Sequence, residues 1–268
     1  MYIKESNKKR AARIEEIMKR LDAHYGDHPA IFLKTGVEGS DASAPRDASL
    51  ENAGGSQPGA DTAQAAENLR NEEAWRLLFA TILSAQCTDA RVNMVTKDLY
   101  RKYRTLEDFA SCELAELEQD IRSTGFYHNK AKNIKACAQT LLSRHGGIVP
   151  DTIEALTALP GVGRKTGNLI LGNIYGKDSI VVDTHVKRIS NRLGLAASDD
   201  PVKVEYQLME VLPAAYWIRW NTHIIALGRS LCMSQRPNCA ACYLRDLCPS
   251  RDQASDYWKQ CLKEQRKL

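Results

Sequence analysis

Lys165 and the residues around it have the composition of a nucleophilic site. The lysine follows the turn sequence Leu-Pro-Gly-Val-Gly, at the point where the pattern predicts that a helix begins. Arg164 beside it and the positive end of that helix both favour the neutral amine. A neutral amine is the form that attacks an electrophilic carbon to give a Schiff base. The alternative is a simple contact between the ammonium group and a phosphate.

A carboxylate in an unusual setting follows Lys165 along the chain. Asp183 lies 18 residues later in the stretch Val-Val-Asp-Thr-His, where apolar residues precede it. Because these neighbours are expected to be buried, we expect Asp183 in a cleft rather than on a solvated face. The alternative is that Asp183 caps a helix that begins near Thr184. The two roles are compatible.

Four of the eight cysteines fall within 17 residues near the end of the chain. They are Cys232, Cys239, Cys242 and Cys248, separated by six, two and five residues. Four thiolates this close along the chain can surround one compact metal centre, which indicates a reducing compartment. Zinc sites more often pair two C-x-x-C units, and only one such unit occurs here. The spacing by itself therefore leaves iron–sulfur and zinc open.

The elements that position Lys165 read as a helix, a tight turn and a second helix. Asp151 and Glu154 predict a capping box at the start of the first helix. Pro160 and Gly161 end that helix, and Gly163 is expected to let the backbone turn. Because the first amides of the second helix lack intrahelical partners, they form an anion site suited to a phosphate. LPGVGRKTG is thus the signature of a helix-hairpin-helix, which contacts a DNA backbone.

Helical periodicity continues through the rest of the chain. Ile14, Ile17, Met18 and Leu21 share one face of a helix within residues 8–25. Further helices are predicted at 77–83, 90–103, 134–142 and 217–227, with Thr105 and Asp108 forming another capping box. Residues 125–130 are predicted as a polar turn. No strand pattern appears, so the predicted fold class is all-α.

Charge is distributed unevenly along the chain. Residues 35–66 contain five acidic residues against one arginine and no aromatic residue, which predicts a solvated linker. Their net charge of −4 leaves +8 on the rest of the chain, which suits a nucleic-acid partner. No apolar run approaches the length of about 20 residues that a membrane span requires. The basic start has no apolar region after it, which excludes a secretory signal.

Five blocks of the sequence, in order, resemble the endonuclease III family of DNA glycosylases. They are ILSAQCTDARVN (82–93), GFYHNKA (125–131), LPGVGRKTGN (159–168), VDTHVKRISNRL (182–193) and the four-cysteine run. The resemblance implies two helical domains with a DNA-binding cleft between them. The implied organisation is an N-terminal helix of the cluster domain (1–33), a flexible acidic insert (34–69), a six-helix barrel with the hairpin (70–185) and the rest of the cluster domain (186–268).

The resemblance also implies a reaction. Lys165 attacks the anomeric carbon of a damaged nucleotide and displaces the base, while Asp183 stabilises the positive charge on the sugar. The resulting imine acidifies the neighbouring C–H, so that the 3′ phosphate leaves by β-elimination. The implied activity is a bifunctional base-excision DNA glycosylase and abasic-site lyase for oxidised pyrimidines.

Residues that hold the DNA and the cofactor are implied in the same way. Gln86 fills the gap left by the flipped-out nucleotide, and Phe126, where many relatives have an aliphatic residue, wedges between bases of the other strand. The hairpin contributes Gly161, Gly163 and Arg164, and the loop between the first two cysteines contributes Arg236. The family's cofactor at this cysteine spacing is a [4Fe–4S] cluster. The expected partner is damaged double-stranded DNA, bound by a monomer in the cytoplasm of a bacterium or in a eukaryotic nucleus or mitochondrion.

Other functions fit parts of the sequence. An adenine glycosylase of the same superfamily lacks a lysine at position 165 and requires a glutamate just before the Gln86 region, where this chain has Thr81, Ile82 and Leu83. A relative that is specific for another lesion is a second alternative. A non-catalytic helix-hairpin-helix module is a third, although a protein that only binds DNA has no need of both Lys165 and Asp183.

Overall fold

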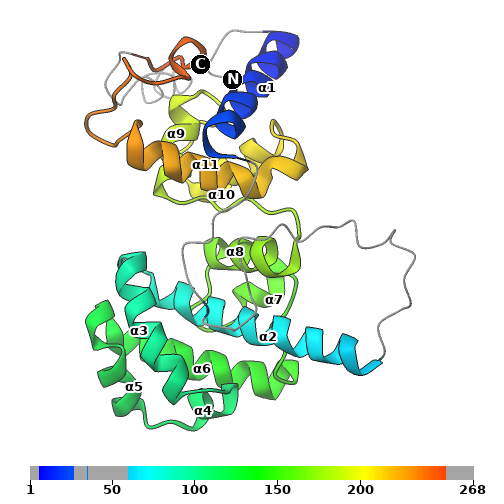
Figure 1. Ribbon diagram of the computed structural model, residues 1–268, viewed down its shortest axis with the longest axis vertical. Coiled ribbons are helices and arrows are strands. Elements are labelled where there is room, and N and C mark those ends of the chain that lie inside the picture. The colour runs from blue at the N-terminus through cyan, green and yellow to red at the C-terminus, as the bar shows by residue number, and fades with distance from the viewer. Residues whose placement is uncertain (1–5, 27–34, 36–59, 252–268) are drawn as a thin grey trace. The chain divides into compact units, whose positions relative to one another are not determined.

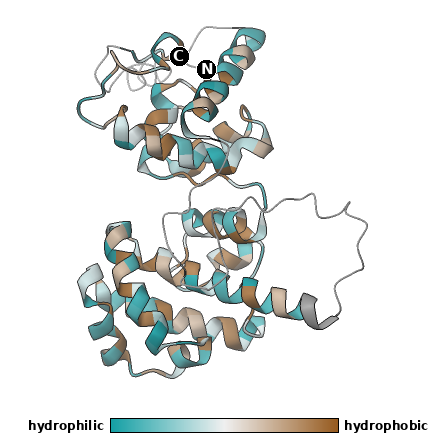
Figure 2. Ribbon diagram, viewed as in Figure 1, coloured by the Kyte–Doolittle hydropathy of each residue, from teal (hydrophilic) through white to brown (hydrophobic). Residues whose placement is uncertain are grey.

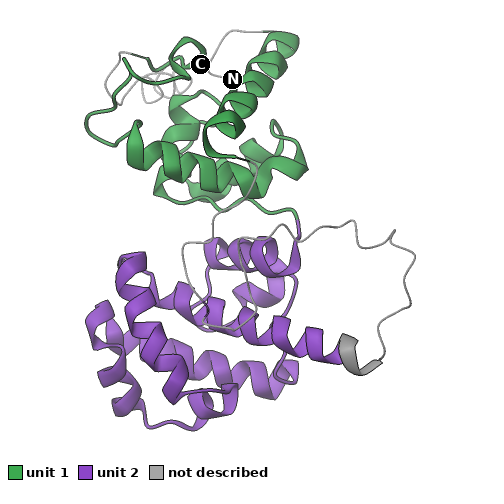
Figure 3. Cartoon of the chain, viewed as in Figure 1, with its two compact units in different colours: residues 1–29, 178–268 green, residues 30–177 purple. Residues whose placement is uncertain are grey.

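The computed structural model describes residues 6–26, 35 and 60–251 (Figure 1). Every regular element in this part of the chain is a helix, which confirms the predicted all-α class. The chain forms two compact units (Figure 3). We call residues 30–177 the hairpin unit and residues 1–29 with 178–268 the cysteine unit. The division falls between Lys177 and Asp178, earlier than the expected 185, so Lys165 and Asp183 belong to different units.

The hairpin unit contains a continuous series of helices. They are α2 (Ala60–Leu83), α3 (Asp89–Lys102), α4 (Leu106–Ser111), α5 (Leu114–Asp120), the 3₁₀ helix η2 (Arg122–Thr124), α6 (Tyr127–His145), α7 (Ile153–Thr157) and α8 (Arg164–Tyr175). The C-terminal half of α2 is the centre of the unit and packs against α3, α6 and α8. In its core, Phe109 meets both Trp75 and Phe79 edge to face, with the Phe79 and Phe109 ring centroids 5.0 Å apart.

Helix α2 starts earlier than the sequence predicts. It begins at Ala60, inside the stretch 34–69 that was predicted to be a flexible insert, so that prediction is wrong for residues 60–69. This part of the helix is rich in alanine, which has the highest helix propensity, and it extends a segment that is already fixed by burial at Trp75 and beyond. Residues 36–59 of the predicted insert lie outside the described residues.

Helix caps test the local predictions directly. The Thr105–Asp108 capping box is confirmed: Thr105 Oγ1 accepts from the Asp108 amide, and Asp108 Oδ2 accepts from the Thr105 amide. The predicted cap at Asp151 is wrong, because Thr152 caps α7. The Asp151 carboxylate instead accepts from Lys177 Nζ at 2.6 Å, and this ion pair lowers the pKa of Asp151.

The cysteine unit joins the first helix to the C-terminal part of the chain. Its helices are α1 (Asn7–Tyr25), α9 (Thr184–Arg192), α10 (Pro201–Met209), η3 (Ala214–Tyr216), α11 (Trp217–Ser230) and η4 (Arg245–Leu247). As predicted, Ile14, Ile17 and Leu21 of α1 are buried, and Met18 packs beside them. Trp220 is fully buried at the centre, on α11.

Each unit has its own hydrophobic core of buried residues. Along the helices that supply these residues, hydrophobic and hydrophilic positions are interspersed (Figure 2). Within the described residues, no helix is both long enough and apolar enough to cross a membrane.

Candidate active site and nucleic-acid interface

The hairpin consists of α7, a short turn and α8. The turn closes through hydrogen bonds from the Leu159 amide to the Leu156 carbonyl and from the Val162 amide to the Leu159 carbonyl, both 3.1 Å. Gly163 is the N-cap residue of α8, and having no side chain it offers no capping acceptor. No capping side chain therefore competes for the first amides of α8, which is the arrangement that an anion site requires.

The two hairpin glycines are required for different reasons. Gly161 has a φ of +77°, and a Cβ there would lie 2.7 Å from Cβ of Asn133 on α6. Gly163 has a φ of −92°, which any residue can adopt, and a Cβ there would meet nothing within 4 Å. The expectation that Gly163 relaxes the turn is therefore wrong. In the described part of the chain, nothing requires a glycine at this position. A glycine here would allow an external group to approach the backbone closely.

Lys165 lies on the first turn of α8 with its side chain exposed to solvent. In the described part of the chain, we find no hydrogen bond or ion pair to its amine. Arg164 precedes it on the same turn and is half-buried. The amine is thus accessible to a ligand that binds the N-terminus of α8.

Asp183 belongs to the cysteine unit and caps α9. Its Oδ1 accepts from the Val186 amide at 2.7 Å, which confirms the capping role that the sequence left open. Val181 and Val182 before it are buried, and Val182 packs in the core of the cysteine unit, but Asp183 itself is only half-buried. A carboxylate has lone pairs on both oxygens, so one cap hydrogen bond leaves acceptor capacity for a second role.

Gln86 and Phe126 lie on one groove of the hairpin unit, although 40 residues separate them in the chain. Gly161 and Asn133 line the same groove. Phe126 is 66% exposed, so it is not a core aromatic residue, and Gln86 is exposed as well. The structure therefore brings together three of the residues that the resemblance assigns to DNA binding.

The backbone at both positions is unusual. Gln86 has a φ of +54° and Phe126 a φ of +50°, and in the described residues these are the only non-glycine residues with positive φ. Such conformations cost about 1–3 kcal/mol each and concentrate at functional sites. Phe126 also ends the predicted polar turn sooner than expected, because α6 already begins at Tyr127.

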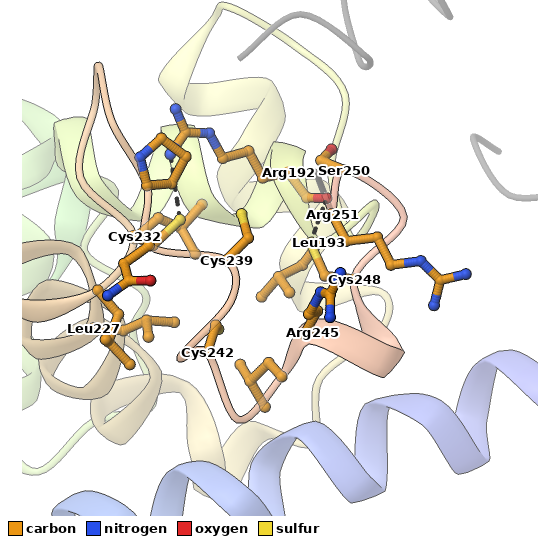
Figure 4. A pocket seen from close by; sticks show the side chains of 15 residues that line it. Arg192, Leu193, Leu227, Cys232, Cys239, Cys242, Arg245, Cys248, Ser250 and Arg251 are labelled. Carbon is orange, nitrogen blue, oxygen red and sulfur yellow. Dashed lines mark hydrogen bonds between the residues drawn. The ribbon is translucent and has the colours of Figure 1, made fainter. Parts of the chain in front are cut away.

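The four cysteines line one cavity of the cysteine unit (Figure 4). No disulfide joins any of them. Burial raises the pKa of the Cys248 thiol to about 12 and raises that of Cys242. A bound metal centre would favour the thiolate form of these thiols. In the described residues, no three side chains of Cys, His, Asp or Glu converge closely enough to hold a single metal ion.

Arg192 contacts the cysteine loop and was not singled out by the sequence. It is buried, and it donates from Nη1 to Cys232 Sγ at 3.3 Å and to the Met233 carbonyl at 2.7 Å. Its Nη2 donates to the Ser234 carbonyl at 2.7 Å. These bonds fix the start of the loop between Cys232 and Cys239, and Arg236 on that loop is exposed. The signal that could have found Arg192 is a basic residue inside the VDTHVKRISNRL block.

Comparisons with known proteins agree on one family. The model of the HhH-GPD superfamily of base excision DNA repair proteins matches residues 79–214. Endonuclease III of Synechocystis is 46% identical over 65% of this chain and 80% of that protein. Endonuclease III of Escherichia coli is 38% identical over 66% of this chain and 84% of that protein. A solved structure of a trapped endonuclease III–DNA covalent intermediate has a TM-score of 0.71 at 34% identity, covering 94% of this chain and 98% of that one.

Proposed function

The chain belongs to the endonuclease III family of base excision DNA repair proteins, and we propose that it removes oxidised pyrimidines from duplex DNA and cleaves the abasic site that remains. The family assignment made from the sequence is confirmed. As a member of this family, the chain is a DNA glycosylase and abasic-site lyase. The lesion class and the roles of individual residues are our proposal.

In the proposed reaction, Lys165 is the nucleophile. Its neutral amine forms a bond to C1′ of the flipped-out nucleotide, the bond from C1′ to the base breaks, and the base leaves with a proton. Ring opening gives a Schiff base. Loss of a proton from C2′ then breaks the bond between C3′ and its phosphate oxygen. Water releases the lysine at the end, so the enzyme is regenerated.

The observation that carries this proposal is the position of Lys165 relative to the anion site. The amine is exposed on the same helix turn as the uncapped amides at the N-terminus of α8. A phosphate held by those amides would bring a sugar of the same strand within reach of the amine. We propose that Asp183 stabilises the positive charge that develops on this sugar and assists the proton transfers.

We propose that the remaining contacts bend and open the duplex. Gln86 and Phe126 enter it from the groove that they share, and unstacking a base costs a few kcal/mol, which such inserted side chains offset in part. Gly161, Gly163 and Arg164 hold a phosphate at the hairpin. The exposed Arg236 contacts a phosphate from the cysteine unit.

We propose that the cavity between the cysteines holds a [4Fe–4S] cluster. Its lining offers four thiols and no carboxylate or imidazole, a donor set that suits such a cluster. A cubane takes one thiolate at each of four corners, so Cys232, Cys239, Cys242 and Cys248 would each hold one iron. When bound, the cluster would supply a rigid anchor for the loop that carries Arg236.

We infer that the protein acts as a monomer on damaged double-stranded DNA. If its source is bacterial, the proposed location is the cytoplasm and its nucleoid; if it is eukaryotic, the nucleus or the mitochondrion. An adenine-specific activity is not supported, because it requires a glutamate just before the Gln86 region, where this chain has Thr81, Ile82 and Leu83. Thr81 is buried, and its hydroxyl group donates to the Leu77 carbonyl at 2.7 Å.

The decisive experiment is borohydride trapping. The wild-type protein should form a covalent adduct with duplex DNA that contains an abasic site or thymine glycol, and Lys165→Gln should form none. Lys177→Gln is the matched control, because Lys177 is an exposed lysine just beyond the other end of α8 and should leave trapping intact. Undiminished trapping by Lys165→Gln would move the nucleophile elsewhere, for instance to the N-terminal amine.

A further inference from the structure

Lys130 is a buried lysine to which the proposed reaction assigns no role. It lies in the first turns of α6 and lines the groove that contains Gln86 and Phe126. Its side chain is only 4% exposed, although lysine is among the residues that are least often fully buried. Burial lowers the pKa of Lys130, so its ammonium group is held in the protein at a cost.

The Lys130 ammonium group joins two helix ends that are far apart in the sequence. Nζ donates to the Leu83 carbonyl at 2.8 Å and to the Thr124 carbonyl at 2.9 Å. Leu83 is the last residue of α2, and Thr124 is the last residue of η2. Carbonyl groups at the C-terminal end of a helix lack an intrahelical donor and carry partial negative charge, so they suit a buried cation.

Each of these helix ends leads directly into a turn with a left-handed residue. Gln86 follows Leu83 by three residues, and Phe126 follows Thr124 by two. Both turns contain a residue in the left-handed region, where the backbone is disfavoured and must be held by its surroundings. An unbranched apolar side chain could fill the same space without the cost of burying a charge. What it could not do is hold two carbonyl groups at a set distance from each other.

We propose that Lys130 is a positioning residue of the DNA interface: its buried ammonium group holds the turn of Gln86 and the turn of Phe126 at a fixed separation. This inference rests on the proposed function, in which both side chains enter the duplex. Two groups that must enter one duplex together depend on their spacing, and a displacement of about 1 Å can cost on the order of 10²-fold in rate.

The chain offers matched variants for a test. Lys130→Met removes the charge and both hydrogen bonds at similar length, and Lys130→Arg keeps a cation with several donors. Lys135→Met is the control, because Lys135 also lies on α6 and donates from Nζ to a backbone carbonyl, that of Cys112, at 2.6 Å. Cys112 belongs to neither of the two turns.

The measurement is single-turnover base excision on a duplex that contains thymine glycol. A parallel fluorescence assay places 2-aminopurine opposite a stable abasic-site analogue, where insertion of a side chain unstacks the probe. Lys130→Met should slow excision by about 10- to 100-fold and reduce the fluorescence increase. Lys130→Arg should stay within about threefold of the wild type, and Lys135→Met should change neither signal.

A double-mutant cycle separates positioning from general stability. If Lys130 acts through the two turns, Lys130→Met should change excision by less than about twofold in a protein that already carries Gln86→Ala and Phe126→Ala. An equal loss in both backgrounds, an equal loss in Lys135→Met, or no restoration by Lys130→Arg would overturn the inference. Should Lys130→Met fail to fold, Lys130→Gln takes its place in the same cycle.

Failure of the proposed function would give a different result. If the Gln86→Ala, Phe126→Ala protein excises thymine glycol at the wild-type rate, these residues do not assist base flipping, whatever the effect of Lys130. If that protein is slow but shows no coupling to Lys130→Met, the role of the two side chains stands and the positioning role of Lys130 is wrong.

Discussion

The two units build their parts of the candidate interface by different means. In the hairpin unit, the candidate interface is formed mainly by backbone conformation. Its features are a glycine turn, a helix start without a side-chain cap and two left-handed residues, and a packed helical core supports them. In the cysteine unit, residues 232–251 contain no regular element longer than the three-residue η4. Side chains hold this segment, among them Arg192 on α9 and Arg20 on α1, which donates to both carboxylate oxygens of Asp246.

This difference indicates that a bound cofactor would stabilise the cysteine unit rather than the hairpin unit. A helical core stabilises the hairpin through burial of apolar surface, which requires no ligand. The cysteine loop lines a cavity and contains little regular structure, so we expect its order to depend on what the four thiols bind. We therefore expect loss of one of these four cysteines to affect the cysteine unit and to spare the hairpin unit.

Cys242→Ser should have the largest effect. We expect loss of the yellow-brown colour, of the four irons and four sulfides per chain, and of most soluble protein, because the loop loses its anchor. Amide hydrogen exchange should show lost protection in residues 232–251 and retained protection in α2–α8. Cys112→Ser, in the hairpin unit, is the control and should keep all of its iron. If metal analysis of the wild-type protein found one zinc and no sulfide, the bound metal would be zinc and not an iron–sulfur cluster.

Asp183→Asn should separate catalysis from capping. Asparagine caps a helix about as well as aspartate, so the melting temperature should barely change. The excision rate should fall by about 10²-fold or more, because the charge is gone. Duplex affinity should stay within several-fold of the wild type. Near-normal turnover in Asp183→Asn would leave Asp183 as a helix cap alone.

Replacing each of the two hairpin glycines by alanine should have a different effect on stability and on DNA binding. Gly161→Ala should destabilise the protein by about 1–3 kcal/mol, because its φ is positive and its Cβ would meet Asn133. Gly163→Ala should change stability by less than about 1 kcal/mol, since its conformation and the space around it are permissive. It should nevertheless weaken binding to duplex DNA. Equal melting temperatures for the two variants would contradict the distinction between them.

Arg236→Ala should have the smallest effect. It should weaken binding to all duplex sequences alike and reduce the salt dependence of the affinity by about one phosphate contact, a slope change of roughly 0.9. The measurement is the dissociation constant at several salt concentrations. Lys203→Ala, an exposed residue of α10 in the same unit, is the control and should leave the slope unchanged. An unchanged slope in Arg236→Ala would remove this loop from the DNA interface.

The sequence by itself determined the features whose signals are local. Each of these features depends on residues a few positions apart: the all-α class, the helix-hairpin-helix, the Thr105–Asp108 capping box and the buried face of α1. The cysteine quartet is likewise a matter of spacing within one short segment. Such patterns can be recognised without the fold, because the interacting groups are neighbours along the chain.

The tertiary structure decided what depends on distant partners. Asp151 does not cap α7, because Lys177, 26 residues away, takes its carboxylate. Three other features have no local signature either. They are the left-handed backbone at Gln86 and Phe126, the buried ammonium group of Lys130, and the hydrogen bonds from Arg192 to the cysteine loop. Each of them balances the cost of strain or burial against contacts with residues far away in the sequence, and that balance exists only once the chain has folded.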